Sequence, residues 1–307
     1  MGGWLRSRLQ AGYERHVCDS IEDGPRHVAV IQDGNRRYAR SRGVDPSAGH
    51  HEGAETTGAM LRWCDDVGVR ELTVYAFSTE NFDRPPEERE ALFELIATKL
   101  REFADAEEVH DREVCIRAIG DRQRLPDHVR EAIVYAEDRT GDYDRFILNV
   151  ALAYGGRTQL LGAARNIARA VDDGELAVDD IDLDRIETRL YHRPLRDVDL
   201  IIRTGGDERT SNFLPWHANG NEAAVYFSTA YWPEFRKIDF LRGIRTYAAR
   251  ETSWRRSRAR RAVALLRAMG ETELADAHAI LARFRTSSPI GDRSTTTDDG
   301  ESERPAD

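Results

Sequence analysis

The sequence has few lysines, and this scarcity begins to narrow the class of protein. Among 45 basic residues only Lys99 and Lys237 are lysines, and 55 acidic residues bring the formal net charge to -10. A general nucleic-acid binder needs a basic face, so this balance argues against that class. The excess of arginine has two interpretations: codon usage in a GC-rich genome, or bidentate binding of oxyanions by guanidinium groups. The positions of the arginines can separate these interpretations.

Cysteines are also few, and long apolar runs are absent. Cys18, Cys64 and Cys115 show no CxxC spacing, so we expect reduced thiols in a cytoplasmic protein. No run approaches the roughly 18 apolar residues of a membrane span, and no signal-peptide core is present. Residues 1–24 are predicted to be an N-terminal extension that is packed or disordered, with a helix on a membrane surface as the alternative.

Several ligand-binding motifs are missing. Neither GxGxxG nor GxxxxGK[ST] is present, which argues against dinucleotide-binding and P-loop proteins. The run His50-His51-Glu52 lacks the second histidine of HExxH, so we place His50 at the edge of a site and His51 on the surface. No DDxxD motif is present, which argues against the all-helical prenyl synthases.

Short apolar runs alternate along the chain with longer helical patterns. The predicted strands are His27–Ile31, Leu72–Phe77, Val114–Ile119, Phe146–Ala151, Val198–Ile202 and Ala224–Phe227. The predicted helices are Gly53–Val67, Glu87–Asp111, Asp127–Arg139, Thr158–Asp172 and Asp184–Tyr191, with a helical region after Trp232. This alternation predicts a single α/β domain over residues 25–285, in which helices flank a central six-stranded, mostly parallel sheet. Residues 286–307 are predicted to be a disordered acidic tail.

Polar segments follow three of the predicted strands. They are DGNRR from Asp33, STENFDRPP after Phe77, and RTGGDERTSNF from Arg203. Each segment supplies arginine, an acid and hydrogen-bonding side chains. Because ligands bind at the carboxyl ends of parallel strands, we expect the three segments on one rim of the sheet.

This combination of residues suits a polyanion. Glycines let backbone N–H groups approach phosphate oxygens, and guanidinium groups match those oxygens in pairs. The acids fit such a site when a cation such as Mg²⁺ lies between them and the phosphates. Taken singly, the DG and GG pairs are more often ordinary turns, and Arg84 could simply precede a helix. Three such strand ends together favour a diphosphate site with a metal.

Four segments resemble the motifs of the cis-prenyltransferases, the undecaprenyl diphosphate synthase family. They are HVAVIQDGNRRYA, YAFSTENFDRP, LNVALAYGGR and DLIIRTGGDERTSNFLPW, in order from about His27 to Phe235. The resemblance implies a homodimer with a hydrophobic tunnel in each subunit. It also implies a Mg²⁺-dependent reaction that adds isopentenyl diphosphate repeatedly to an allylic diphosphate. The Glu87–Asp111 stretch is a candidate tunnel wall, although its apolar stripe fits core packing equally well. That stripe consists of Leu92, Phe93, Leu95, Ile96 and Phe103.

The resemblance also implies roles by position. Asp33 would handle metal and diphosphate, and Asn35 would orient the isopentenyl unit or its proton loss; the other implied catalytic residues are Ser78 and Glu80. The implied substrate-binding residues are Gly34, Arg36, Arg37, Tyr38, His50, Asn81, Phe82, Arg84, Arg203, Arg209 and Ser211. In that set, Arg37 and Arg84 match allylic-diphosphate ligands, whereas the isopentenyl-diphosphate site would be formed by Arg203, Arg209 and Ser211. The implied metal ligands are Asp33 and Glu222.

The sequence departs from the family pattern in four places. Pro46 stands where the family usually has a basic residue, and Tyr38 stands where it has tryptophan. The HANGNEAAVYF segment is about two residues longer than usual, so the choice of Glu222 as second metal carboxylate is ambiguous. The C-terminal arginine-x-glycine segment, which in the family reaches the partner's site, lacks its glycine. The candidate substitutes are Arg250, Arg255 and Arg256.

The leading hypothesis is a cytoplasmic cis-prenyltransferase that makes a long-chain polyprenyl diphosphate for a glycan lipid carrier. Its partners would be a second copy and the two diphosphate substrates, without nucleic acid and with peripheral membrane contact for product release. The acidic, arginine-rich composition suggests a salt-adapted archaeal source, and archaeal relatives often start from geranylgeranyl diphosphate. Two alternatives stay open: a non-catalytic subunit of a heteromeric cis-prenyltransferase, and a phosphate-sensing or nucleotide-binding protein.

Overall fold

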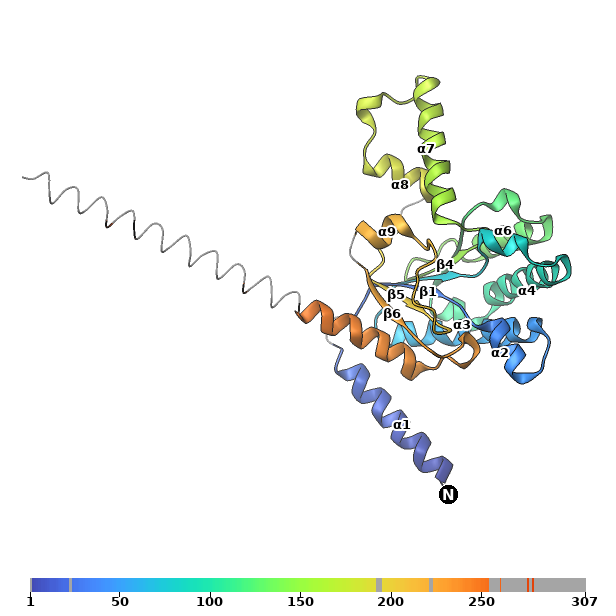
Figure 1. Ribbon diagram of the computed structural model, residues 1–307, viewed down its shortest axis with the longest axis vertical. Coiled ribbons are helices and arrows are strands. Elements are labelled where there is room, and N and C mark those ends of the chain that lie inside the picture. The colour runs from blue at the N-terminus through green and yellow to red at the C-terminus, as the bar shows by residue number, and fades with distance from the viewer. Residues whose placement is uncertain are drawn as a thin grey trace, which may run out of the picture. The chain divides into compact units, whose positions relative to one another are not determined.

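The computed structural model describes residues 2–21, 24–191, 195–220 and 223–253, together with residues 260, 275 and 278. The chain divides into two units, residues 1–252 and 253–307, and the labelled helices and strands of Figure 1 belong to the first. The predicted tail at 286–307 lies outside the described residues, as do Glu222, Arg255 and Arg256. The predicted domain limits at 25 and 285 therefore stay a prediction.

Six parallel strands form one sheet in the order β3-β4-β2-β1-β5-β6, which confirms the predicted α/β class. The strands are β1 (His27–Ile31), β2 (Glu71–Tyr75), β3 (Val114–Ile119), β4 (Phe146–Ala151), β5 (Leu200–Arg203) and β6 (Ala224–Phe227). β2 ends two residues earlier than predicted, because the amides of Ala76 and Phe77 both donate to the Ala151 carbonyl and the regular ladder stops. β5 extends one residue further than predicted, which brings Arg203 opposite Ile31 at the rim.

The helices follow the predicted pattern, with differences at their ends. They are α1 (Gly2–Asp19), α2 (Asn35–Arg42), α3 (Pro46–Asp66), α4 (Pro86–Asp105), α5 (Glu107–Asp111), α6 (Asp127–Thr140), α7 (Gly156–Asp172), α8 (Leu183–Tyr191) and α9 (Pro215–Gly220), with a further helix over residues 237–253. The single helix predicted over Glu87–Asp111 is divided at Ala106, whose extended backbone separates α4 from α5. α3 begins at Pro46 instead of Gly53, because Asp45 caps it by accepting from the Ser47 amide.

Each side of the sheet has its own core, since alternate strand residues point to opposite faces. Val28 and Val30 of β1 face the larger core, to which α3, α4 and α6 contribute. Ala29 and Ile31 face the smaller core, which α7 and α8 help to close. Val17 of α1 is buried in the larger core, so the end of the N-terminal extension packs against the body.

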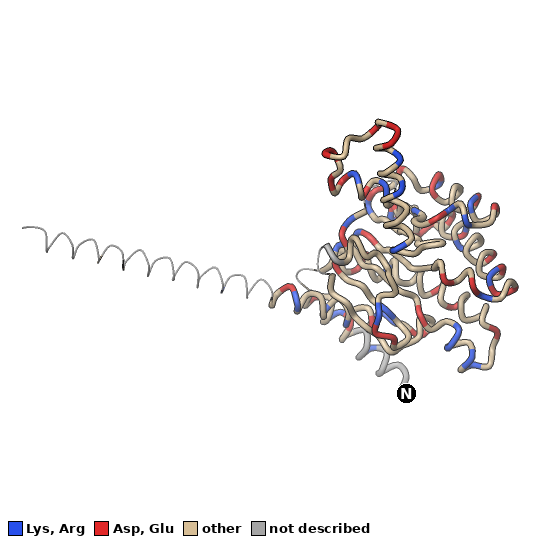
Figure 2. Tube along the Cα trace, turned by 45° about the horizontal axis from the view of Figure 1, so that its top comes forward, with Lys and Arg blue, Asp and Glu red and all other residues tan. Residues whose placement is uncertain are grey.

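The charged residues are mixed along the helices and loops. Figure 2 shows basic and acidic positions interspersed over the trace. Among the described residues, no helix is both long enough and apolar enough to span a bilayer.

Candidate active site

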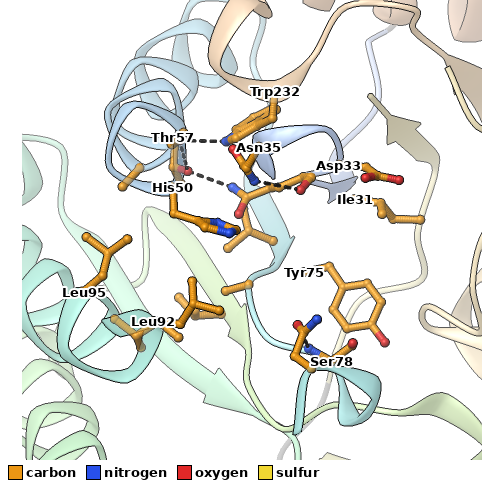
Figure 3. Close-up of a pocket in the computed structure, with 18 of the residues that line it drawn as sticks. Ile31, Asp33, Asn35, His50, Thr57, Tyr75, Ser78, Leu92, Leu95 and Trp232 are labelled. Carbon is orange, nitrogen blue, oxygen red and sulfur yellow. Dashed lines mark hydrogen bonds between the residues drawn. The ribbon is translucent and has the colours of Figure 1, made fainter. Parts of the chain in front are cut away.

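The carboxyl ends of β1, β2 and β5 open onto one cavity of about 530 Å³ (Figure 3). Two segments supply much of its polar end: the β2 loop, residues 76–85, and the β5 loop, residues 204–214. The polar lining residues include Asp33, Asn35, His50, Ser78, Glu80, Asn81, Arg84, Arg203, Arg209 and Ser211. The three polar segments singled out in the sequence therefore do share one rim.

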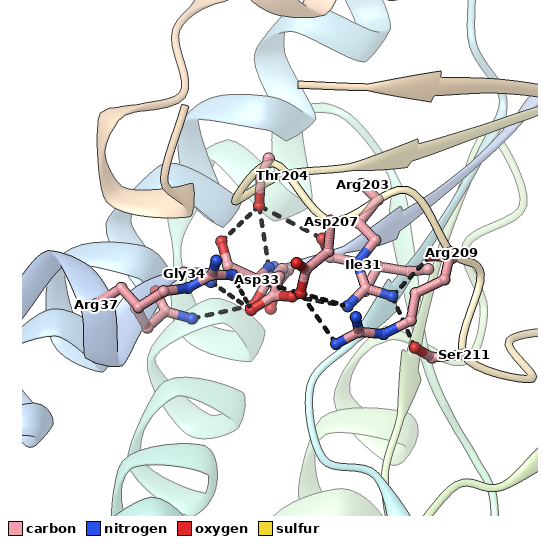
Figure 4. Close-up of polar contacts among 11 residues, drawn as sticks. Ile31, Asp33, Gly34, Arg37, Arg203, Thr204, Asp207, Arg209 and Ser211 are labelled. Carbon is pink, nitrogen blue, oxygen red and sulfur yellow. Dashed lines mark hydrogen bonds and ion pairs between the residues drawn. The ribbon is translucent and has the colours of Figure 1, made fainter. Parts of the chain in front are cut away.

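Asp33 lies at the centre of the polar contacts (Figure 4). Its Oδ1 accepts hydrogen bonds from the Gly34 amide at 2.7 Å and from Arg37 Nη2 at 3.0 Å, and its Oδ2 accepts from Arg203 Nη2 at 2.7 Å. Thr204 Oγ1 accepts from the Asp33 amide and donates to the Asp33 carbonyl. Burial works to raise the pKa of Asp33, but the hydrogen bond from Arg203 and the charges of Arg203 and Arg37 lower it. Asp33 is thus an anion in a fixed orientation.

Asp207 is a second carboxylate among the same arginines. Its Oδ2 lies 2.9 Å from Arg209 Nη2, 3.5 Å from Arg203 Nη2 and 3.8 Å from Arg37 Nη2. Arg203 Nη1 also donates to the Arg209 carbonyl and to Ser211 Oγ, both at 2.6 Å. With Asp33, two carboxylates face three guanidinium groups, which leaves an excess of positive charge for an anionic ligand.

Two glycines allow these loops to approach each other. Gly34 has φ 101° and Gly205 has φ 84°, a region that favours glycine. A Cβ on Gly34 would lie 2.6 Å from the Tyr231 ring, and a Cβ on Gly205 would lie 2.6 Å from Arg37 Nη2. A side chain on Gly205 would displace Arg37, which donates to Asp33, and a side chain on Gly34 would displace the Tyr231 ring.

Arg84 and His50 form a separate polar pair beside the β2 loop. Arg84 Nη1 donates to Glu88 Oε1 at 2.7 Å and to His50 Nε2 at 3.3 Å. Burial, with the charges of Arg84 and Arg36, lowers the pKa of His50 to about 4, so its imidazole is neutral and can accept. His50 therefore orients Arg84 without adding charge.

Asn35 begins α2 at the wall of the cavity. Its Nδ2 donates to the Gln32 carbonyl at 3.1 Å, whereas its Oδ1 is buried without a hydrogen-bond partner among the described residues. A Cβ on Gly53 would lie 2.4 Å from that oxygen, and Trp232 Nε1 donates to the Gly53 carbonyl at 2.6 Å. A buried amide oxygen without a partner is available to a ligand.

The other end of the cavity is apolar. Its lining residues are Ala54, Val74, Ala76, Leu92, Leu95, Ile96, Leu100, Phe103, Leu148 and Val150. α4 therefore forms a wall as predicted, except that Phe93 packs in the core at 4.9 Å from the ring of Phe77. Lys99 also lines this region, and its ammonium lies 2.6 Å from Glu55 and 2.8 Å from Glu102.

Some residues predicted to bind substrate lie away from the cavity wall. Tyr38 is buried and donates to Glu52 at 2.5 Å. Arg36 is half-exposed and pairs with Glu88 at 3.4 Å. Phe82 packs among core aromatic rings. None of these three side chains lines the cavity. Arg250, a candidate substitute for the family's C-terminal arginine, is exposed on the helix over residues 237–253.

Comparison with known proteins decides the family. A family model described as "Putative undecaprenyl diphosphate synthase" matches residues 31–255. The chain belongs to this family. This cis-prenyltransferase is 60% identical over 283 residues to a protein of Haloarcula marismortui, and the match covers 92% of this chain and 93% of that one. It is 61% identical over 289 residues to a protein of Halobacterium salinarum, covering 93% and 95%.

Both relatives are named tritrans,polycis-undecaprenyl-diphosphate synthase (geranylgeranyl-diphosphate specific). Among solved structures, the cis-prenyltransferase resembles lavandulyl diphosphate synthase from Lavandula x intermedia in complex with dimethylallyl diphosphate. The TM-score is 0.67 at 33% identity, covering 73% of this chain and 95% of that one. The resemblance stated from the sequence motifs is confirmed.

Three residues of the cis-prenyltransferase site received no assigned role from the sequence. Asp207 was visible as an acid after a strand, inside the RTGGDERTSNF segment. Lys99 was visible as one of two lysines, although nothing local connected it with a cavity. Trp232 reaches Gly53 across 179 positions of sequence, and no local pattern carries such a contact.

Proposed function

We propose that this cis-prenyltransferase extends geranylgeranyl diphosphate with successive isopentenyl units to give a long-chain polyprenyl diphosphate, the precursor of a glycan lipid carrier. The observation that carries the proposal is one cavity with guanidinium groups at one end and an apolar wall at the other. Such a cavity suits a ligand with an ionic head and an apolar tail. The choice of starter is supported by the printed names of the two haloarchaeal relatives.

The two diphosphates are assigned to different loops. Arg84 stands beside the apolar wall of α4, so it suits the substrate with the long tail, together with Arg37. The proposed site for isopentenyl diphosphate is formed by Arg203, Arg209 and Ser211. Arg209 is 64% exposed in its side chain and pairs with Asp207, so an arriving diphosphate can exchange with that carboxylate.

The proposed reaction breaks the allylic C–O bond, and the bonding electrons leave with the diphosphate. The double bond of isopentenyl diphosphate forms the new C–C bond, and a proton lost from the adduct leaves the new Z double bond. Guanidinium groups fixed before the reaction stabilise the charge on the leaving group. Asn35 would orient the isopentenyl unit, and the loop bearing Ser78 and Glu80 would cover the reacting atoms.

Mg²⁺ is the proposed cofactor, and the described residues fit it. Asp33 is kept ionised, and Asn35 Oδ1 is buried without a hydrogen-bond partner among the described residues, so the rim where diphosphates would bind offers a carboxylate and a free amide oxygen. Mg²⁺ is usually bound by a few protein oxygens together with the phosphates of a substrate. When bound, the ion would neutralise charge on the departing diphosphate. Glu222 remains a predicted second ligand.

We also propose a cytoplasmic homodimer with peripheral membrane contact for product release. Three large apolar side chains are exposed: Leu161 of α7 (51%), Val178 in the α7–α8 connection (66%) and Leu183 of α8 (65%). A second copy would remove them from water. The unpaired cysteines suit a reducing compartment. Light scattering should give twice the chain mass of 34.9 kDa; a monomer at micromolar concentration would reject the dimer.

The proposed activity is tested with the purified protein alone. It is incubated with labelled isopentenyl diphosphate, Mg²⁺ and one allylic diphosphate at a time, and products are resolved by chromatography. Geranylgeranyl diphosphate should be extended most efficiently, and chelation by EDTA should stop incorporation. Equal use of shorter starters would reject the starter but not the reaction. No incorporation with any starter would favour the non-catalytic subunit.

A further inference from the structure

Tyr154 touches both loops that carry the polar residues of the cavity. It follows β4 in the run Leu152–Gly156, has no exposed surface, and has no role in the proposed chemistry. Its neighbour Ala153 has φ 48°, so the chain turns sharply out of the sheet at this point. The position of Tyr154 is therefore fixed by backbone and packing together.

The backbone of Tyr154 holds the β2 loop. Its amide donates to the Phe77 carbonyl at 3.0 Å, and its carbonyl accepts from the Thr79 amide at 2.8 Å and from Tyr75 Oη at 3.1 Å. These contacts lie on both sides of Ser78, which forms an isolated parallel bridge with Tyr154. The β2 loop is thus anchored at the point where it enters the cavity.

The side chain of Tyr154 holds the β5 loop. Its hydroxyl accepts from the Leu214 amide at 3.2 Å and is also paired with the Tyr191 hydroxyl. The loop needs support, because Ser211, Asn212 and Leu214 have φ of 49°, 57° and 48°. Residues with side chains keep such angles only where their surroundings impose them.

Of the two glycines after Tyr154, one also packs against the β2 loop and the other against the β5 loop. A Cβ on Gly155 would lie 2.7 Å from Thr79 Oγ1 of the β2 loop. A Cβ on Gly156 would lie 2.2 Å from the Asn212 carbonyl oxygen of the β5 loop. Three consecutive residues therefore pack against both halves of the site.

We infer that Tyr154 is a positioning residue for prenyl transfer: its backbone fixes the β2 loop, and its hydroxyl keeps the β5 loop in its strained shape. That shape brings Ser211 Oγ and the Arg209 carbonyl to Arg203, which in turn faces Asp33. The inference rests on the proposed function in one respect, namely that the β5 loop binds isopentenyl diphosphate.

The test compares Tyr154→Phe with the unaltered enzyme in steady-state kinetics in which both substrates are varied. The substitution keeps the ring contacts and removes the acceptor of the Leu214 amide. The KM for isopentenyl diphosphate should rise about tenfold, while the KM for geranylgeranyl diphosphate and kcat change by no more than about twofold. A merely structural role would lower thermal stability without this split between the two KM values, and that result overturns the inference.

Three further variants keep the outcome interpretable. Tyr143→Phe removes a hydroxyl bonded to His110, away from the cavity, and should leave both KM values unchanged. Arg209→Gln tests the assignment of the β5 loop: if it raises the KM for isopentenyl diphosphate and Tyr154→Phe does not, the inference fails and the proposed function stands. If Arg209→Gln leaves that KM unchanged, the assignment itself fails. Should Tyr154→Phe not fold, Gly156→Ala must produce the same split by displacing Asn212; its absence overturns the inference.

Discussion

Arg203 donates to Asp33 across 2.7 Å, although the two residues are 170 positions apart in the chain. The side chain of Arg203 is only 4% exposed, so its guanidinium depends on the acceptors around it. Within the described part of the chain, Asp33 is the charged acceptor at hydrogen-bond distance. Removing one partner of a buried ion pair leaves the other charge unpaired. The resulting loss of stability is larger than the stability that the intact pair contributes. The contact joins the ends of β1 and β5, and it makes Asp33 both a structural and a chemical part of the site.

Asp33→Ala is expected to abolish turnover and to leave the fold intact. Both the proposed metal ligand and the anchor of Arg203 are lost, so we expect kcat to fall on the order of 10³-fold, the upper range for loss of one group that stabilises developing charge. Circular dichroism checks the fold, and label incorporation measures turnover. Asp207→Asn, which loosens the same arginines without touching Asp33, should act mainly on KM. Near-normal turnover in Asp33→Ala would contradict the role assigned to this carboxylate.

Gly205→Ala is expected to raise the KM for the allylic diphosphate, which Arg37 is proposed to bind, about tenfold or more. The new Cβ would lie 2.6 Å from Arg37 Nη2 and would push that guanidinium off Asp33. Gly43→Ala is the matched control, because Gly43 also has a positive φ of 66° but a Cβ there would meet no atom of the described residues within 4 Å. Kinetics of both variants separate crowding from backbone strain. Equal KM values in the two variants would mean that the close approach of Gly205 to Arg37 does not affect substrate binding.

Much of the sheet could be predicted because its strands are short apolar runs with clear ends. The limits of β1, β3, β4 and β6 agree with those read from the sequence. The meeting of three polar segments at one rim also followed from parallel topology alone. What could not be predicted is how loops far apart in sequence support each other, because periodicity reports only on neighbours along one element.

The cavity illustrates that limit. Leu92, Leu95 and Phe103 are predicted and observed on the wall, but Phe93 lies in the core, because one turn of α4 faces both environments. The contact of Tyr154 with Leu214 joins positions 60 apart and depends on an unusual φ at the second residue. Neither feature leaves a signal in composition or spacing.

Lys99→Met is expected to lengthen the product by one or more isopentenyl units. The Lys99 ammonium bridges Glu55 of α3 and Glu102 of α4 beside the apolar end of the cavity. A hydrocarbon chain that grows past this point must lie next to a charge, which is unfavourable. Methionine keeps the stem and removes the charge. Lys237→Met, which loses a similar 2.6 Å pair with Asp66 outside the cavity lining, is the control. An unchanged product distribution in Lys99→Met would show that this lysine does not limit the chain.

Stability should fall as pH decreases from about 6.5 to 4, and His27 should account for part of the loss. His27 is fully buried in β1, where Nδ1 donates to the Arg196 carbonyl and Nε2 faces Thr73 Oγ1, both at 2.7 Å. Burial lowers the pKa of His27 to about 4, so between that value and the ordinary 6.5 the unfolded chain binds a proton that the folded chain does not. The contribution is therefore full above pH 6.5 and is lost toward pH 4, by roughly 3 kcal/mol at most for a shift of about 2.5 pKa units. His27→Gln should flatten the dependence of the melting temperature on pH, leaving a residual slope from His50, whose pKa is also lowered to about 4. His51→Gln, at an exposed position, should keep the full slope, and the same slope in His27→Gln would contradict the prediction.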